Sequence, residues 1–250
     1  MNLLRVLSSR AAIQQAKFQE ELDIWRLYHL LYYFEQSRGQ DVKVPRPEHK
    51  PYRKQYQLVH EGVISLVDSA QSKPFSLSLD NTCGVRLYGK AVPGTVVCFY
   101  PGVVFLPYYL NQMPNFPNIS KDNPYLMSRT DGSVIDAKDL EAMNLNNSPF
   151  GIGHLVRHPP NGLQPNVLPF SYRIGADFPS SLLVHVPNRH FRKPFFFRLM
   201  HTKMHCIVFV AMRVIKDEEL FLNYRLHPDS QLPQGYCAID KDEDRRRWKY

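Results

Sequence analysis

The chain has 250 residues, of which 44% are hydrophobic and 12% aromatic, so it can form a sizeable core and is not wholly disordered. Its formal net charge of +8 allows acidic partners such as nucleic acid without requiring them. No apolar stretch approaches the ~18 residues of a membrane helix, so we predict no membrane partner. The four cysteines form no CxxC pair, which excludes a zinc ribbon and a redox CxxC site.

The first 74 residues are predicted to form a helical N-terminal region with a basic, proline-rich linker. Residues 1–18 are basic and precede the first acid, Glu20, as in a transit peptide, but the helical pattern continues and favours an ordinary helix. Helical periodicity predicts helices over residues 18–38 and 58–70, with a linker over 40–57. We therefore expect an intracellular protein, nuclear or cytoplasmic, with a mitochondrial location as the weaker alternative.

From residue 75 onward the pattern changes to short β-rich runs separated by Gly, Pro and Asn. Strands are predicted over residues 85–88, 95–100, 125–128, 133–136, 167–174, 206–214 and 219–224. The runs 96–100 and 207–210 are almost continuously apolar, which predicts burial on both faces. The fold class is thus mainly β (α+β), with one domain over residues 75–225 and a charged tail over 226–250 that ends in a solvated helix.

Most local catalytic and metal-binding patterns are missing. His201, His205 and Cys206 are close in sequence but precede a strand and lack a base at helical spacing, so we predict no metal site. There is no Gly-x-Ser-x-Gly elbow and no phosphate-binding loop. Two stretches, 43–54 and 189–198, interleave basic and aromatic residues, which suits single-stranded nucleic acid. The alternative, which we favour, is a solvated linker and a core phenylalanine cluster.

Several motifs, taken in order, resemble the SET domain of protein-lysine methyltransferases. The opening strands correspond to residues 83–87 (CGVRL), 92–97 (VPGTVV) and 100–102 (YPG), and the central strand to 131–137 (DGSVIDA). The Asn-His-x-Cys-x-Pro-Asn-Val segment of the family corresponds to Arg157-His158 and residues 165–167 (PNV). The family ending corresponds to residues 209–215 (FVAMRVI) and 218–224 (EELFLNY). Within the family, the chain is most similar to the group typified by SET domain-containing protein 9.

The resemblance implies a SET-domain β-clip with pseudoknot-like C-terminal threading, preceded by N-terminal helices. It implies an S-adenosyl-L-methionine-dependent protein-lysine N-methyltransferase whose partner is a protein substrate presenting a lysine. Tyr224 would be the catalytic residue that aligns the transfer. Gly84, Arg157, His158, Asn166 and Tyr224 would bind the cofactor.

Some positions depart from the family pattern and leave alternatives open. Thr82 and Arg157 stand where the family has Gly and Asn, Leu222 replaces an aromatic residue, and the zinc-binding cysteine cluster after Tyr224 is missing. These departures keep open a non-catalytic SET-fold interaction module. A basic nucleic-acid-binding protein, with weak contacts through the two basic stretches, is the third alternative. The target lysine, the methylation degree and the oligomeric state do not follow from the sequence.

Overall fold

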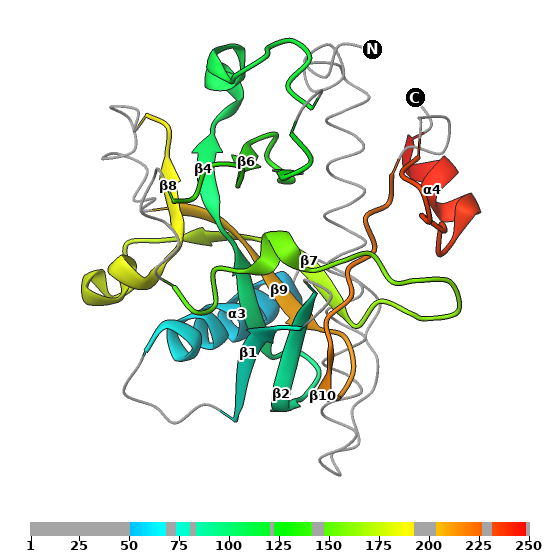
Figure 1. The fold of residues 1–250 in the computed structure, drawn as a ribbon. Coiled ribbons are helices and arrows are strands. Elements are labelled where there is room, and N and C mark those ends of the chain that lie inside the picture. The colour runs from blue at the N-terminus through cyan, green and yellow to red at the C-terminus, as the bar shows by residue number, and fades with distance from the viewer. Residues whose placement is uncertain are drawn as a thin grey trace.

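The structure is a computed structural model. It describes residues 51–68, 74–80, 84–120, 123–141, 148–192, 204–226 and 232–248. Within these residues the protein is mostly β, with few helices (Figure 1). The predicted helix over residues 18–38 lies outside them. No helix in this part of the chain is long and apolar enough to cross a membrane.

The strands form three small sheets. The first has the order β1 (Phe75–Leu79), β2 (Val85–Ala91) and β10 (Ile215–Glu219), and the second has the order β3 (Val96–Tyr100), β9 (Met204–Ala211) and β7 (Val167–Ile174). The third has the order β5 (Leu126–Ser128), β6 (Val134–Asp136), β4 (Gly102–Phe105) and β8 (Asn188–His190). All strand pairs are antiparallel except β4 and β8, which are parallel.

The core is centred on the second sheet. Every residue of β3 is buried, and so is every residue of β9 after Met204. This confirms the prediction that the two apolar runs are covered on both faces. Because both faces of these strands are buried, other elements of the fold must cover the second sheet on both sides.

Helix α3 (Pro51–Val67) covers part of this core against β3. Its buried face includes Val59 and Val63, and the His60 Nδ1 atom lies 2.5 Å from the Tyr172 hydroxyl. The helix begins seven residues earlier than predicted, so the last part of the predicted linker is helical. Pro51 occupies the first helical position, where a missing backbone N–H costs no hydrogen bond.

The remaining helices are short. Three 3-10 helices connect strands: η1 (Pro107–Gln112), η2 (Gly153–Leu155) and η3 (Ser180–His185). Helix α4 (Lys241–Trp248) forms in the charged tail, as predicted, and Figure 1 shows it on the opposite side of the molecule from β8. The Arg225–Glu243 ion pair at 3.4 Å links α4 to the end of the β region.

Two sets of strand predictions need correction. Strands β1, β4 and β8 were not predicted, and β10 lies between the predicted strands 206–214 and 219–224 except for Glu219. Conversely, the strand predicted over 219–224 is wrong, because β10 ends at Glu219 and Phe221 and Leu222 form only isolated bridges. The chain there is held by single contacts to another segment rather than by a ladder.

Acidification is expected to destabilise the protein through His205 on β9. Burial lowers the pKa of His205 to about 4, with Arg129 lowering it further and Asp131 opposing. In the unfolded chain His205 has its ordinary pKa and binds a proton more readily than in the folded protein. The folded state is therefore not penalised by His205 above pH ~6.5, and it loses stability as the pH falls toward 4. At pH 5 the loss attributable to this group is about 2 kcal/mol.

The measurement is the free energy of unfolding from urea titrations at pH 7.5 and pH 5. His205→Gln should lose about 2 kcal/mol less than the parent between the two pH values. The matched control is His185→Gln, since His185 is exposed at the end of η3. Equal losses in the parent and in His205→Gln would contradict the assignment.

Candidate functional site

Two segments that are far apart in sequence meet beside the first sheet. The Leu222 N–H donates to the Arg157 carbonyl at 2.9 Å, and the Asn166 N–H donates to the Phe221 carbonyl at 3.0 Å. Parallel bridges join Arg157 to Phe221 and Val167 to Leu222. The segment after β10 therefore runs alongside residues 157–167, and this contact brings most of the predicted site residues together.

Asn166 fixes the course of this segment. Its amide Nδ2 donates to the Glu219 carbonyl at 2.7 Å, and its Oδ1 accepts from the Phe221 N–H at 2.7 Å. The residue is 0% exposed. Asn166 thus acts as a positioning residue behind the site, and its contact with a cofactor stays a prediction.

A charged cluster lies directly against Gly84. The Arg157 Nε donates to Glu219 Oε1 at 2.8 Å, and a guanidinium nitrogen lies 3.9 Å from Asp80. A Cβ on Gly84 would lie 2.2 Å from Glu219 Oε1 and 2.9 Å from Arg157 Nε, so only glycine allows this close approach. The Gly84 N–H is itself bonded to Asp80 Oδ1 at 2.7 Å. The side chain of Arg157 is 42% exposed, so the cluster reaches the surface.

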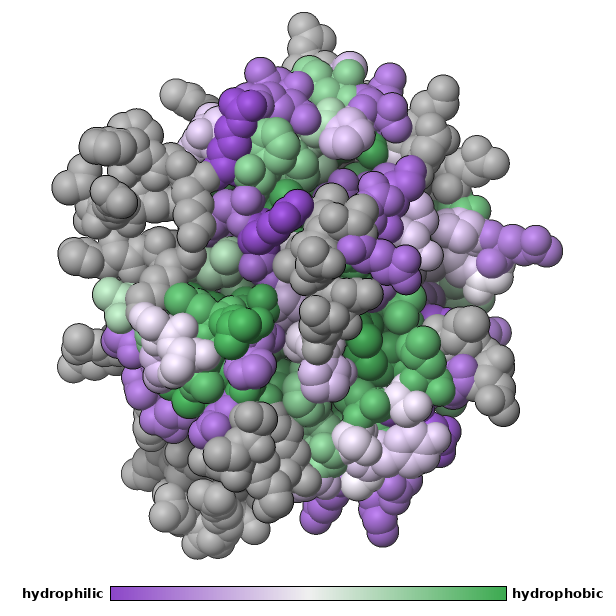
Figure 2. Space-filling model, turned by 60° about the vertical axis from the view of Figure 1, so that its left-hand side comes forward, coloured by the Kyte–Doolittle hydropathy of each residue, from purple (hydrophilic) through white to green (hydrophobic). Residues whose placement is uncertain are grey.

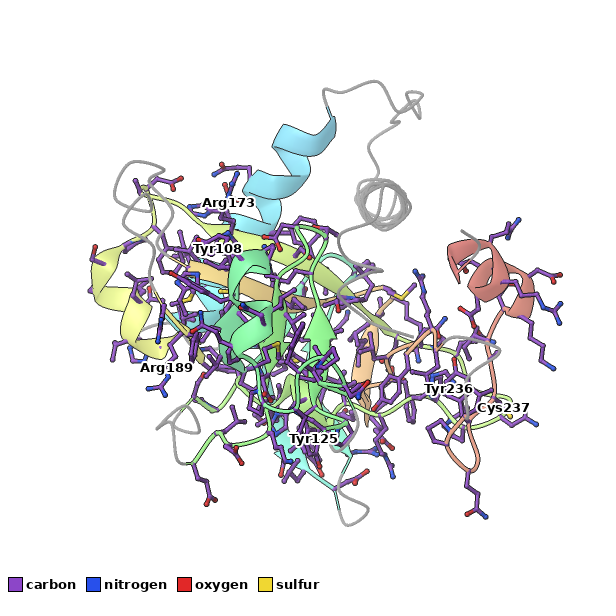
Figure 3. All side chains as sticks on the ribbon, turned by 90° about the horizontal axis from the view of Figure 1, so that it is seen from above. Tyr108, Tyr125, Arg173, Arg189, Tyr236 and Cys237 are labelled. Atoms are coloured by element: carbon purple, nitrogen blue, oxygen red, sulfur yellow. The ribbon has the colours of Figure 1, made fainter. Side chains whose placement is uncertain are left out.

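His158 connects this region to Tyr224 and to the C-terminal tail. Its Nδ1 accepts from the Tyr224 N–H at 3.3 Å, so the Nε2 atom carries the proton and donates to the Cys237 carbonyl at 2.7 Å. The imidazole also packs on the Tyr236 ring, with centroids 4.3 Å apart. In Figure 3, Tyr236 and Cys237 lie on the same side of the molecule as α4. The tail therefore covers one face of His158.

Tyr224 lies beside His158, with ring centroids 5.6 Å apart. Its hydroxyl donates to the Val156 carbonyl at 3.0 Å, while the residue as a whole is 43% exposed. Burial raises the pKa of Tyr224, a backbone hydrogen bond from His158 and the charge of Arg157 oppose this, and the Tyr125 phenol adds to the increase. The phenol is thus oriented, neutral at physiological pH and accessible from one side.

Two further tyrosines, Tyr100 and Tyr125, lie near enough to Tyr224 to affect pKa values in this region. Burial raises the pKa of the Tyr100 hydroxyl, and Tyr224, Asp136 and Tyr125 raise it further. Tyr100 ends β3, whereas Tyr125 precedes β5 and packs edge-on against His154. The three residues Tyr100, Tyr125 and Tyr224 are named the tyrosine cluster below.

The structure thus brings Gly84, Arg157, His158, Asn166 and Tyr224 into one neighbourhood. It adds Glu219, Tyr236 and the tyrosines at 100 and 125, which the sequence analysis did not select. Of these, Tyr100 and Glu219 carried a usable signal, since they belong to the Tyr-Pro-Gly and Glu-Glu-Leu motifs. The predicted departure at Thr82 lies outside the described residues. In the described part of the chain, no group of three or more His, Cys, Asp or Glu residues could hold a metal ion.

Comparisons with known proteins give matches among solved structures but none among family models or curated proteins. Among solved structures, the chain is similar to CpSET8 from Cryptosporidium, with 12% sequence identity and a TM-score of 0.39. The match covers 86% of this chain and 98% of that one.

Proposed function

We propose that the protein is an S-adenosyl-L-methionine-dependent protein-lysine N-methyltransferase of the SET family, with its transfer centre at Tyr224. The observation that carries the proposal is the meeting of the 157–167 segment with residues 219–224, which sets Tyr224 against His158. The ordered SET-like motifs predict this contact across more than sixty residues of sequence. A chance match to the motifs would not explain why the tyrosine at the predicted position is also oriented by a hydrogen bond.

The charged cluster fits the amino-acid end of the cofactor. A methionine-type zwitterion carries one carboxylate and one ammonium group, and the cluster offers Arg157 for the first and Glu219 or Asp80 for the second. Because Gly84 has no side chain, Arg157 and Glu219 lie directly against its backbone. When bound, the cofactor supplies a methyl group on a sulfonium cation to the lysine amine.

The protein's own contribution is alignment. The bond from the Tyr224 hydroxyl to the Val156 carbonyl fixes the phenol, which is neutral at physiological pH because burial moves its pKa above the ordinary value. Neutral phenol oxygens can accept hydrogen bonds from an amine without trapping it as an ion pair. A lysine amine that is partly desolvated in such a site has a lowered pKa, so no dedicated base is required.

The proposal is tested by calorimetry with S-adenosyl-L-methionine and by transfer of a labelled methyl group to lysine peptides. We expect binding, with label on peptides that contain lysine and none on the same peptides with arginine instead. Arg157→Ala should raise the Kd for the cofactor by about 10-fold, the usual size of a lost charge-assisted bond. The control is Arg213→Ala, which breaks the exposed Arg213–Glu218 pair at 2.6 Å.

A second function is favoured by one specific observation. The Arg157–Glu219 pair already fills the space beside Gly84, where the cofactor would approach. If the Arg157–Glu219 pair does not separate to admit the cofactor, the protein would be a non-catalytic SET-fold interaction module. Absence of both calorimetric heat and methyl transfer would support this reading and overturn the first.

A further inference from the structure

An aromatic stack on the side of the molecule away from the candidate site ends in an arginine. Phe191 follows β8 and stacks on Phe105 of β4, with ring centroids 4.7 Å apart and planes inclined by 21°. The guanidinium carbon of Arg192 lies 5.4 Å from the centroid of the Phe191 ring. Phe191 is 37% exposed, so the stack reaches the surface with a planar cation at its end.

Two tyrosines of η1 extend this surface. Tyr109 meets Phe191 edge-on at 6.2 Å, and Tyr108 meets Tyr109 edge-on at 4.6 Å. Tyr108 is 54% exposed. Figure 3 shows Tyr108 and Arg189 on one side of the molecule, opposite Tyr236 and Cys237. We name Tyr108, Tyr109, Arg189, Phe191 and Arg192 the aromatic–arginine surface.

The segments that form this surface carry only basic charge, and Asp131, on the neighbouring turn before β6, is paired with Arg129. Its elements come from two stretches of sequence, residues 81–121 and 178–216, that contain no aspartate or glutamate. Arg189 and Arg192 are exposed, and neither takes part in an ion pair with another described residue. Figure 2, which turns the β8 side forward, shows hydrophobic surface broken by hydrophilic side chains. A partner must therefore supply negative charge and flat apolar groups together.

We propose that the aromatic–arginine surface binds single-stranded nucleic acid. Unpaired bases can stack on the Tyr108 ring and on the Arg192 guanidinium, while Arg189 pairs with a phosphate. An acidic polypeptide would satisfy the arginines but would leave the exposed Tyr108 ring without a flat partner. This inference is independent of methyl transfer, because the surface shares no residue with the candidate site.

The test is fluorescence anisotropy of the full chain with a labelled oligo(dT) of about 20 nucleotides. Tyr108→Ala keeps the charge and should weaken binding by about 10-fold through the loss of one stacked base. Arg189→Gln combined with Arg192→Gln should lower the slope of log affinity against log salt by about 0.7, for the one phosphate contact of Arg189, and should weaken binding further through the lost base stack on Arg192.

Controls of the same chemistry lie elsewhere on the chain. Tyr88 is also an exposed tyrosine with an arginine near its ring, since Arg86 lies 5.9 Å from the ring centroid. It lies on β2, outside the aromatic–arginine surface, so Tyr88→Ala should bind like the parent. Arg245→Gln combined with Arg246→Gln on α4 removes the same charge from another side and should keep the parent salt slope. Thermal melting checks that each variant is folded.

Three outcomes would overturn the proposal. The first is that the parent protein does not bind oligo(dT), or that Tyr108→Ala binds as tightly as the parent. The second is that duplex DNA of equal length binds as tightly, which would indicate charge attraction without stacking. The third is preferential binding of poly-L-glutamate, which would make the surface a site for acidic polypeptides.

Discussion

Asn166→Ala is expected to lower the free energy of unfolding by roughly 3 kcal/mol, the sum of two lost buried hydrogen bonds. The substitution removes the acceptor of the Phe221 N–H and a donor to the Glu219 carbonyl, both at 2.7 Å. Asn166 itself is 0% exposed, so little water replaces the lost partners. Because the same bonds hold the segment that carries Tyr224, activity should fall together with stability.

Urea denaturation gives the free energy, and thermal melting should show a decrease of about 10 °C in Tm for a chain of this size. Asn111→Ala is the matched control, since Asn111 is exposed in η1 and its truncation should change stability by less than ~0.5 kcal/mol. A loss below about 1 kcal/mol for Asn166→Ala would mean that the 219–221 segment is held by its backbone bridges alone.

The sequence predicts strands well where burial alternates or is continuous. The predicted bounds of β7, Val167–Ile174, agree residue for residue with the structure. β8 could not be predicted, because it is three residues long, contains Asn188, Arg189 and His190, and is defined by parallel pairing with β4. Such pairing depends on a strand that is distant in sequence, and it produces no alternation of apolar and polar residues from which β8 could be predicted.

The error over residues 219–224 has a similar cause. The run contains strand-forming residues, but its partners after Glu219 are the Asn166 side chain and the backbone of Arg157 and Val167, and these contacts form no continuous ladder. Only tertiary structure decides that this segment leaves the sheet at Glu219.

Prediction of the site depended on motif order rather than on periodicity. The hydrogen bond between His158 and Tyr224 joins residues 66 positions apart, a separation that no local pattern can indicate. Tyr236 lies in a tail without apolar periodicity, so its packing against His158 emerges only from the structure. Glu219 was within the Glu-Glu-Leu motif, but its role against Gly84 requires the contact itself.

Tyr224→Phe is expected to reduce the kcat of methyl transfer by roughly 100-fold, the effect of removing one positioned polar group from a transfer centre. The ring and its packing on His158 remain, while the hydroxyl that donates to the Val156 carbonyl at 3.0 Å is lost. The Kd for the cofactor should stay within about twofold, because the proposed zwitterion contacts lie on Arg157 and Glu219. Stability should fall by about 1 kcal/mol, the contribution of a single hydrogen bond.

The matched control is Tyr236→Phe, which removes another phenol hydroxyl next to His158. That hydroxyl accepts the Leu226 N–H at 3.2 Å, so its loss should weaken the docking of the tail and leave kcat within a few-fold of the parent. Single-turnover measurements with saturating cofactor separate the chemical step from binding. Full kcat in Tyr224→Phe, or an equal loss in both variants, would place the transfer centre elsewhere in the tyrosine cluster or remove it altogether. A selective loss in Tyr224→Phe would tie the chemistry to the one phenol that the His158 segment and the chain after β10 hold between them.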